Sequence, residues 1–176
     1  QHRISIEKRP PAAADRQTPG HWEADFMLFA TYGQVILVAH ERTSRAIVIA
    51  RTQDRKADTT AQALGDILAP IPQPLRSTMT FDNGPEFARH YRLTQQLGIQ
   101  TFFCDRHSPW QKGGVENAIG RLRRSIPRKT NLDTLSHDDI DHAAGLYNNT
   151  PRKCLGFKTP AEAFHDQLLH LVCEST

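Results

Sequence analysis

The sequence predicts an α/β fold built on a mixed five-stranded sheet with helices on both faces. Three strand-like segments follow one another closely, and the apolar spacing then alternates between helical and strand periods, which gives the order βββαβαβ followed by further helices. A length of 176 residues corresponds to one domain, which is large enough to form a core without disulfides or a structural metal. Apolar residues make up 38% of the chain, which excludes collagen-like and disordered classes.

The first part of this order is an antiparallel meander. Its three strands are rich in apolar and β-branched residues, are separated by short polar turns, and are expected over residues 22–29, 34–40 and 45–51. Several prolines lie among charged residues before the meander. We therefore expect an N-terminal linker over residues 1–19, a folded core over 20–172 and a short tail over 173–176.

Helices and strands alternate in the next part of the chain. Apolar residues at helical spacing predict a helix over residues 58–68, which Pro70, Pro72 and Pro74 terminate. A fourth strand is predicted over 75–81, a helix over 85–97 and a fifth strand over 99–104. Because a strand, helix and strand in succession form a right-handed parallel crossover, the fourth and fifth strands should join the meander in one sheet.

Three further helices are predicted after the fifth strand. They are expected over residues 115–126, 138–148 and 160–171. The last has Thr159 as its N-cap and Glu162 at the capping-box position.

The distribution of charge is more informative than its total. The net charge of +3 is too small to indicate a nucleic-acid partner by itself. Residues 105–130, however, contain seven basic and two acidic residues. This segment forms a local basic patch of the kind that binds DNA or RNA.

Several other features exclude alternative classes. The longest apolar stretch, near Val35–Ala39, is far too short to cross a bilayer, and residues 1–3 do not start a signal peptide. The three cysteines are widely separated and match no zinc-ligand spacing, which favours reduced thiols. We therefore expect a cytoplasmic protein that makes no membrane contact. Because the sequence does not begin with Met, we also expect it to be a piece of a longer polypeptide.

Three acidic residues stand out by their positions. Asp25 lies inside the first strand, Asp82 follows the fourth strand, and Glu116 opens a helix after a glycine-rich loop. Each alone has a structural explanation: a solvent-facing strand charge, an Asp-Asn-Gly turn and a first-turn helix acid. If the first and fourth strands are neighbours, however, the three carboxylates meet and repel one another unless divalent cations bind them. Mg²⁺ prefers such oxygen ligands, and two ions support in-line displacement at phosphorus.

Three motifs containing these acids resemble a known family. The segments GHWEAD (20–25), FDNGPEF (81–87) and HSPWQKGGVEN (107–117) are similar to the integrase-core catalytic domain of DDE transposases, within the retroviral-integrase-like superfamily. The 33 residues between Asp82 and Glu116, with the ending PRKCLGFKTPAE (151–162), resemble the insertion-sequence-30 family. That family more often has glutamine at the position of Asn83 and is less rich in glycine before Glu116.

The resemblance implies an RNase H-like fold with Asp25, Asp82 and Glu116 as a metal-binding catalytic triad. The implied activity is that of a Mg²⁺- or Mn²⁺-dependent polynucleotidyl transferase, with two ions expected when DNA is bound. It would cut at a 3′ end and join that end to target DNA. The implied partners are double-stranded DNA, at transposon ends and target, and a second copy of the chain in a homodimer. The implied location is the bacterial cytoplasm, with nucleoid association during the reaction.

Two other functions remain open on the sequence. One is an RNase H-like nuclease that cuts DNA without a transfer step. The other is a DNA-binding or oligomerisation module without catalytic activity, which the three intact acids disfavour. The helix-turn-helix region that family members carry upstream is not in this sequence, so we expect weak sequence specificity.

A second group of residues is a candidate DNA-contact set. Trp110 is expected to stack on a base or to anchor its loop, and Lys112 to contact a phosphate. Asn117 is expected to orient a metal-bound water or DNA, or to be an ordinary surface residue. Arg121, Arg124 and Arg128 recur at helical spacing, which favours a DNA-facing stripe over a plain solvated face. His107 is a candidate for assistance at the site or for loop capping.

Overall fold

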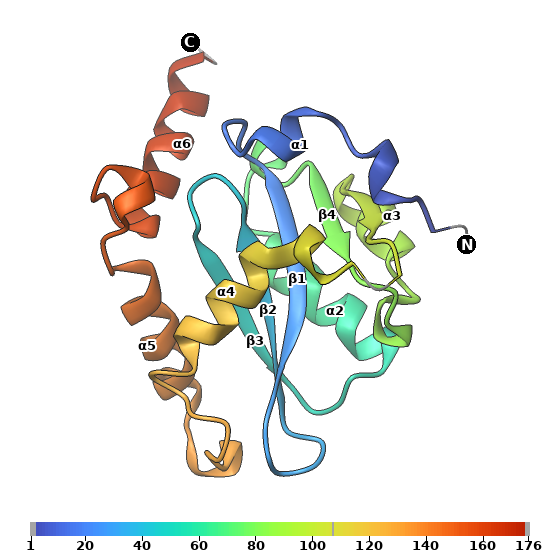
Figure 1. The fold of residues 1–176 in the computed structure, drawn as a ribbon, viewed down its shortest axis with the longest axis vertical. Coiled ribbons are helices and arrows are strands. Elements are labelled where there is room, and N and C mark those ends of the chain that lie inside the picture. Colours follow the sequence, from blue (N-terminus) through green and yellow to red (C-terminus); the bar gives the residue numbers. More distant parts are fainter. Residues whose placement is uncertain (1–2, 107, 175–176) are drawn as a thin grey trace.

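A computed structural model describes residues 3–106 and 108–174 and contains one five-stranded sheet (Figure 1). The strands are β1 (His21–Leu28), β2 (Val35–Glu41), β3 (Ile47–Thr52), β4 (Thr78–Phe81) and β5 (Gln100–Phe103). Their order across the sheet is β3-β2-β1-β4-β5. β1, β2 and β3 pair antiparallel, whereas β4 is parallel to both β1 and β5. The predicted mixed sheet is confirmed.

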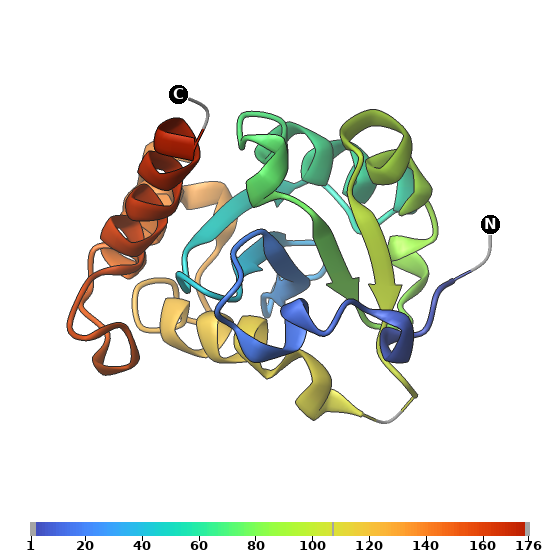
Figure 2. The same cartoon turned by 90° about the horizontal axis from the view of Figure 1, so that it is seen from above.

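Helices cover both faces of the sheet, as Figure 2 shows. The two long crossover helices are α2 (Ala57–Leu68) and α3 (Tyr91–Leu97), which lie on one face. On the other face lie α4 (Gly113–Leu122) and α5 (His137–Asn148). The last helix, α6 (Pro160–Glu174), packs at the side against the apolar residues of the α2 face. None of these helices, within the described chain, is long and apolar enough to cross a membrane.

The alternation of β1 creates two separate cores. Trp22, Ala24 and Phe26 face α2 and α3, whereas Met27 faces α4 and α5. Because successive strand residues point to opposite faces, Asp25 shares the α4 face with Met27. This alternation determines which helix can meet the strand carboxylate.

Two predicted element boundaries are wrong for a common reason. In the predicted strand 75–81, only Thr78–Phe81 is extended, because Gln73–Leu75 forms a 3-10 turn that begins with proline. In the predicted helix 85–97, residues before Tyr91 form tight turns that begin with a 3-10 helix at Pro85–Phe87. The predicted end of that helix at Gly98 is confirmed, with a φ of 71° that suits glycine.

The helix caps follow the sequence closely. The Thr159 hydroxyl accepts a hydrogen bond from the Glu162 amide at 3.1 Å, and the Glu162 carboxylate accepts one from the Thr159 amide at 2.7 Å. Ser136 and Asp139 form a second capping box at the start of α5.

The N-terminal segment lies against the sheet instead of crossing solvent. It contains a 3-10 helix at Ile6–Lys8 and a single helical turn, α1 (Ala12–Asp15), whose Ala13 is fully buried. The Phe103 amide donates to the Ile4 carbonyl at 2.8 Å, which adds a bridge along the outer edge of β5. At the opposite edge, the Asn148 amide group makes hydrogen bonds of 3.0 and 2.9 Å to the backbone of Ile47.

Candidate active site

The parallel pairing of β1 with β4 brings two of the predicted acids together. Glu23 is in register with Thr80, so Asp25 and Asp82 lie the same distance beyond this pair on neighbouring strands. One oxygen of each carboxylate is held by the backbone: the Phe26 amide donates to Asp25 at 2.8 Å, and the Gly84 amide donates to Asp82 at 2.8 Å. The remaining oxygens point toward a common space.

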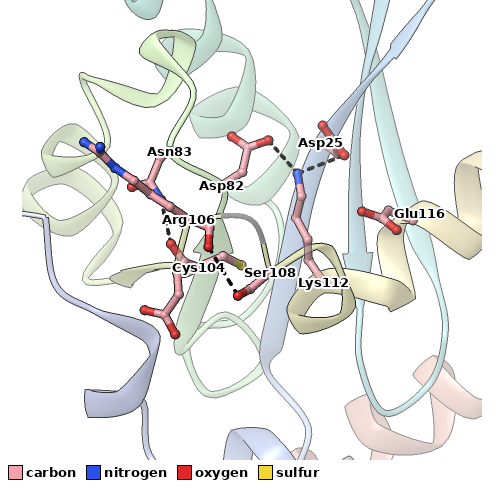
Figure 3. A pocket seen from close by; sticks show the side chains of 9 residues that line it. Asp25, Asp82, Asn83, Cys104, Arg106, Ser108, Lys112 and Glu116 are labelled. Carbon is pink, nitrogen blue, oxygen red and sulfur yellow. Dashed lines mark hydrogen bonds and ion pairs between the residues drawn. The ribbon is translucent and has the colours of Figure 1, made fainter.

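A single ammonium group occupies the space between these two carboxylates. Lys112 Nζ lies 2.9 Å from Asp25 Oδ2 and 2.8 Å from Asp82 Oδ2 (Figure 3). Burial lowers the pKa of Lys112, but the two aspartates outweigh burial and raise it above its usual value. The side chain therefore remains charged at neutral pH. Lys112 was predicted to contact a DNA phosphate, whereas in this structure it is 5% exposed and pairs with the two acids.

Glu116 completes the set of predicted acids. Asp25, Asp82 and Glu116 line one cavity of about 560 Å³, which we call the carboxylate cavity. Glu116 lies in the first turn of α4 and is exposed, on the side of Asp25 away from Asp82 (Figure 3). The cavity also takes residues from the loop after β5, including Cys104 and Arg106.

The donor set suits a hard cation, although the residues do not yet form a closed metal site. Asp25 and Asp82 already share one cation through Lys112, and carboxylate oxygens are the ligands that Mg²⁺ prefers. Across residues 3–106 and 108–174, no three His, Cys, Asp or Glu side chains group closely enough to hold a metal as they stand. Lys112 supplies the positive charge that keeps the two aspartates together.

The sequence prediction missed a second strand carboxylate. Glu23, two residues before Asp25 on the same face of β1, is 1% exposed and forms an ion pair with buried Arg42. Its other oxygen accepts a hydrogen bond from the Val115 amide at 2.9 Å. Glu23 therefore ties the start of α4 to β1, close to Glu116. The signal was the repeat of an acid at a two-residue spacing in a strand.

Cys104 contributes a neutral thiol to the carboxylate cavity. Burial raises its pKa to about 11, because an apolar environment disfavours the thiolate. A thiol in this state is a poor nucleophile.

The predicted DNA-contact residues are placed differently from one another. Trp110 is 74% exposed, and Asn117, Arg121, Arg124 and Arg128 are all exposed. The predicted helix 115–126 ends at Leu122, because the chain continues in tight turns. Arg121, Arg124 and Arg128 therefore do not form a stripe on one helix. His107 lies outside the described residues.

Comparison with known proteins places this fold and these motifs in one family. The integrase core domain family model matches residues 15–109, which include Asp25 and Asp82. The chain belongs to the integrase core domain family. The resemblance drawn from the sequence motifs is confirmed.

Insertion-sequence transposases are the named relatives of this integrase core. It is 39% identical over 159 residues to the transposase for insertion sequence element IS1086 of Cupriavidus metallidurans, covering 90% of this chain and 47% of the relative. It is 38% identical over 157 residues to the transposase InsI for IS30A of Escherichia coli K12, covering 89% of this chain and 41% of the relative. The chain thus spans less than half the length of these proteins.

Solved structures confirm the predicted RNase H-like integrase fold. The catalytic core domain of BIV integrase matches with a TM-score of 0.67 and 20% identity, covering 87% of this chain and 98% of that chain. A chain in the intasome of simian T-cell lymphotropic virus, in complex with PP2A regulatory subunit B56 gamma, matches with a TM-score of 0.70 and 20% identity. That match covers 85% of this chain and 55% of that chain.

Proposed function

We propose that this integrase core is the catalytic domain of a DNA transposase that cuts DNA at a 3′ end and joins that end to a target. The observation that carries the proposal is the shared cation between Asp25 and Asp82, at 2.9 and 2.8 Å, in a cavity that Glu116 also lines. Two strand carboxylates that already share a cation are suited to exchange it for a divalent one.

Asp25, Asp82 and Glu116 are the residues that would hold Mg²⁺ or Mn²⁺. The chemistry supplied when the metal is bound is activation of the attacking oxygen and stabilisation of the leaving oxygen. Asp25 and Asp82 are oriented for this role by the backbone amides of Phe26 and Gly84. Their free oxygens face the cavity, where a phosphodiester would lie.

Lys112 has two successive roles in this proposal. Without DNA it neutralises the repulsion between Asp25 and Asp82. With Asp25 and Asp82 engaged by a divalent cation, the Lys112 ammonium would be free to contact a phosphate of the DNA. Double-stranded DNA is the proposed substrate, with Trp110, Asn117, Arg121, Arg124 and Arg128 as further contacts. Two copies acting together would join two ends.

The test is a strand-transfer assay with Asp25→Asn. The chain is incubated with Mn²⁺, a labelled duplex that has a free 3′ hydroxyl and a plasmid target, and joined products are measured. We expect the variant to lose joined products, because an amide is a weaker ligand for a hard cation. Asp141→Asn, the same change at an exposed helix position, serves as the matched control and should leave activity unchanged.

The circular dichroism spectrum of Asp25→Asn should match that of the control, and its thermal unfolding should remain one cooperative transition above the assay temperature, so that loss of activity is not loss of fold. Transfer by Asp25→Asn at the level of the control would overturn the proposed role of the carboxylates. Cut products without joined products from the unmutated chain would instead indicate a nuclease.

A further inference from the structure

A second cavity lies on the other flank of α4 from the carboxylate cavity. It has a volume of about 250 Å³ and is lined by Gly113, Gly114 and Asn117 of α4, whereas Lys112 and Glu116 line the carboxylate cavity. Four arginines from four separate segments surround it: Arg16 after α1, Arg45 in the β2–β3 turn, Arg121 on α4 and Arg152 between α5 and α6. We call this cavity the arginine pocket.

The arginine pocket gathers four positively charged side chains. Among the ion pairs of the described residues, none involves Arg16, Arg45, Arg121 or Arg152. Burial lowers the pKa of Arg152, and nearby Arg121 lowers it further. Within the described chain, the buried Nε of Arg45 has no hydrogen-bond partner. Like charges gathered in this way disfavour the folded state unless an anion joins them.

Two of these arginines adopt a backbone conformation that favours glycine. Arg16 has a φ of 59° and Arg45 a φ of 66°, and the third non-glycine residue with positive φ in the described chain is Phe157, at 69°. A residue with a side chain is strained in this region, and such strain concentrates at functional sites. The arginine side chains therefore occupy the pocket at the expense of local backbone stability.

His40 of β2 and the glycines at the start of α4 form another part of the pocket wall. His40, which lines the pocket, is 2% exposed, and its Nδ1 has no hydrogen-bond partner among the described residues. A Cβ on Gly114 would lie 3.0 Å from this Nδ1 and 2.7 Å from Glu23 Oε2. Glycine at this position lets the first turn of α4 approach β1 and β2.

We propose that the arginine pocket binds a phosphate group of the DNA backbone. The guanidinium groups match phosphate geometry, and the small cavity suits a single phosphate. The ring of Tyr147 is covered by the Arg152 guanidinium at 4.5 Å from its centroid, so a base has no access to stack there. The inference rests on the proposed function only in taking DNA as the ligand. It assigns a binding role to Arg16, Arg45 and Arg152, which lie outside the catalytic motifs.

The test uses a double variant, Arg16→Gly with Arg45→Gly. Glycine relieves the positive φ at both sites, so we expect the melting temperature to stay within a few degrees of that of the unmutated chain. Binding to a fluorescent duplex is measured by anisotropy in EDTA at several salt concentrations. We expect affinity to fall about tenfold. The slope of log K against log salt should fall in magnitude by about 0.9 for one lost phosphate contact.

Two matched variants control for the backbone and the charge. Phe157→Gly makes the same backbone change at an exposed residue outside the pocket lining. Arg89→Gln with Arg92→Gln removes two positive charges on the surface, as many as the tested variant removes, at residues outside the pocket lining. Both controls should keep the affinity and the salt slope of the unmutated chain.

The outcomes separate this inference from the proposed function. Binding is measured without metal, so a reduced slope supports the pocket even if Asp25→Asn keeps strand-transfer activity. An unchanged slope in the double variant overturns the inference, even if the unmutated chain joins DNA. Stabilisation by inorganic phosphate that the double variant loses, with an unchanged DNA slope, would also overturn it, because the pocket would then take a free anion.

Discussion

The two cavities beside α4 differ in whether their charged side chains have partners of opposite charge within the chain. In the carboxylate cavity, Asp25 and Asp82 are neutralised from within the chain by Lys112. In the arginine pocket, the described residues supply no carboxylate partner for Arg16 or Arg45. The difference is that the carboxylate cavity carries its own counter-charge, whereas the arginine pocket, on the inference above, takes its counter-charge from a bound anion.

We expect the largest effect from a substitution that weakens the attachment of α4, the helix between the two cavities, to β1. Glu23→Gln leaves the buried Arg42 guanidinium without a counter-charge and weakens the bond to the Val115 amide. We expect the free energy of unfolding to fall by about 3–5 kcal/mol, as for other broken buried ion pairs. Urea unfolding measures this loss.

The matched control for that prediction is Glu7→Gln, at an exposed position. Its free energy of unfolding should change by less than about 0.5 kcal/mol. Equal stability of the two variants would mean that packing alone holds α4 in place.

Removing the Lys112 ammonium tests how the charges of the carboxylate cavity are balanced. Lys112→Met leaves Asp25 and Asp82 facing each other, and because both are partly exposed we expect a loss of about 2 kcal/mol in EDTA. Added Mn²⁺ should then stabilise this variant more than the unmutated chain, since no ammonium competes. Thermal unfolding with and without Mn²⁺ tests both statements. Lys129→Met, at an exposed position, should show neither effect.

The positive charge around the arginine pocket should make the stability of the fold depend on pH, through buried His40. Burial is the largest cause that lowers the pKa of His40 to about 3, and the nearby guanidinium groups of Arg45, Arg42, Arg16 and Arg152 contribute to the same shift. Between pH 6.5 and 3 the unfolded chain therefore binds a proton that the folded chain refuses, so stability falls as the pH falls. From pH 7 to 5 we expect the unmutated chain to lose about 2 kcal/mol more than His40→Gln. Parallel pH profiles from urea unfolding would contradict this.

The smallest expected effect lies away from both cavities. Ser136→Ala removes one half of the capping box of α5 and should lower the free energy of unfolding by about 1 kcal/mol. Its DNA affinity and its response to Mn²⁺ should not change. A change in either would show that stability alone alters the two sites.

The sequence was most informative where neighbouring residues decide the outcome. The succession of strands and helices along the chain, the cap at Thr159 and the end of α3 at Gly98 all depend on local spacing and local hydrogen bonds. The position of Asp25 beside Asp82 depended on the first and fourth strands being neighbours, which the sequence left open and the pairing of β1 with β4 shows. The predictions from apolar content were wrong at Gln73–Leu75 and Pro85–Phe87, where the structure has 3-10 turns that contain proline instead of a strand and a helix.

The contacts that span long distances in sequence were not predictable. Lys112 looks like a surface lysine in a loop, and only the fold buries it between two strands. Arg16 and Arg45 carry no motif, and the pocket they form depends on the path of the N-terminal segment and on a turn geometry. Glu23 was visible in its motif, but its partner Arg42 was not.

The hydrogen bonds at the two borders of the sheet restrict how copies of this chain can associate. The Ile4 carbonyl engages β5 at one border, and the Asn148 side chain engages Ile47 of β3 at the other. An incoming strand would have to displace these partners, which protects the protein from edge-to-edge aggregation. If two copies of the chain associate, these contacts favour an interface of helices and loops over a continuous sheet.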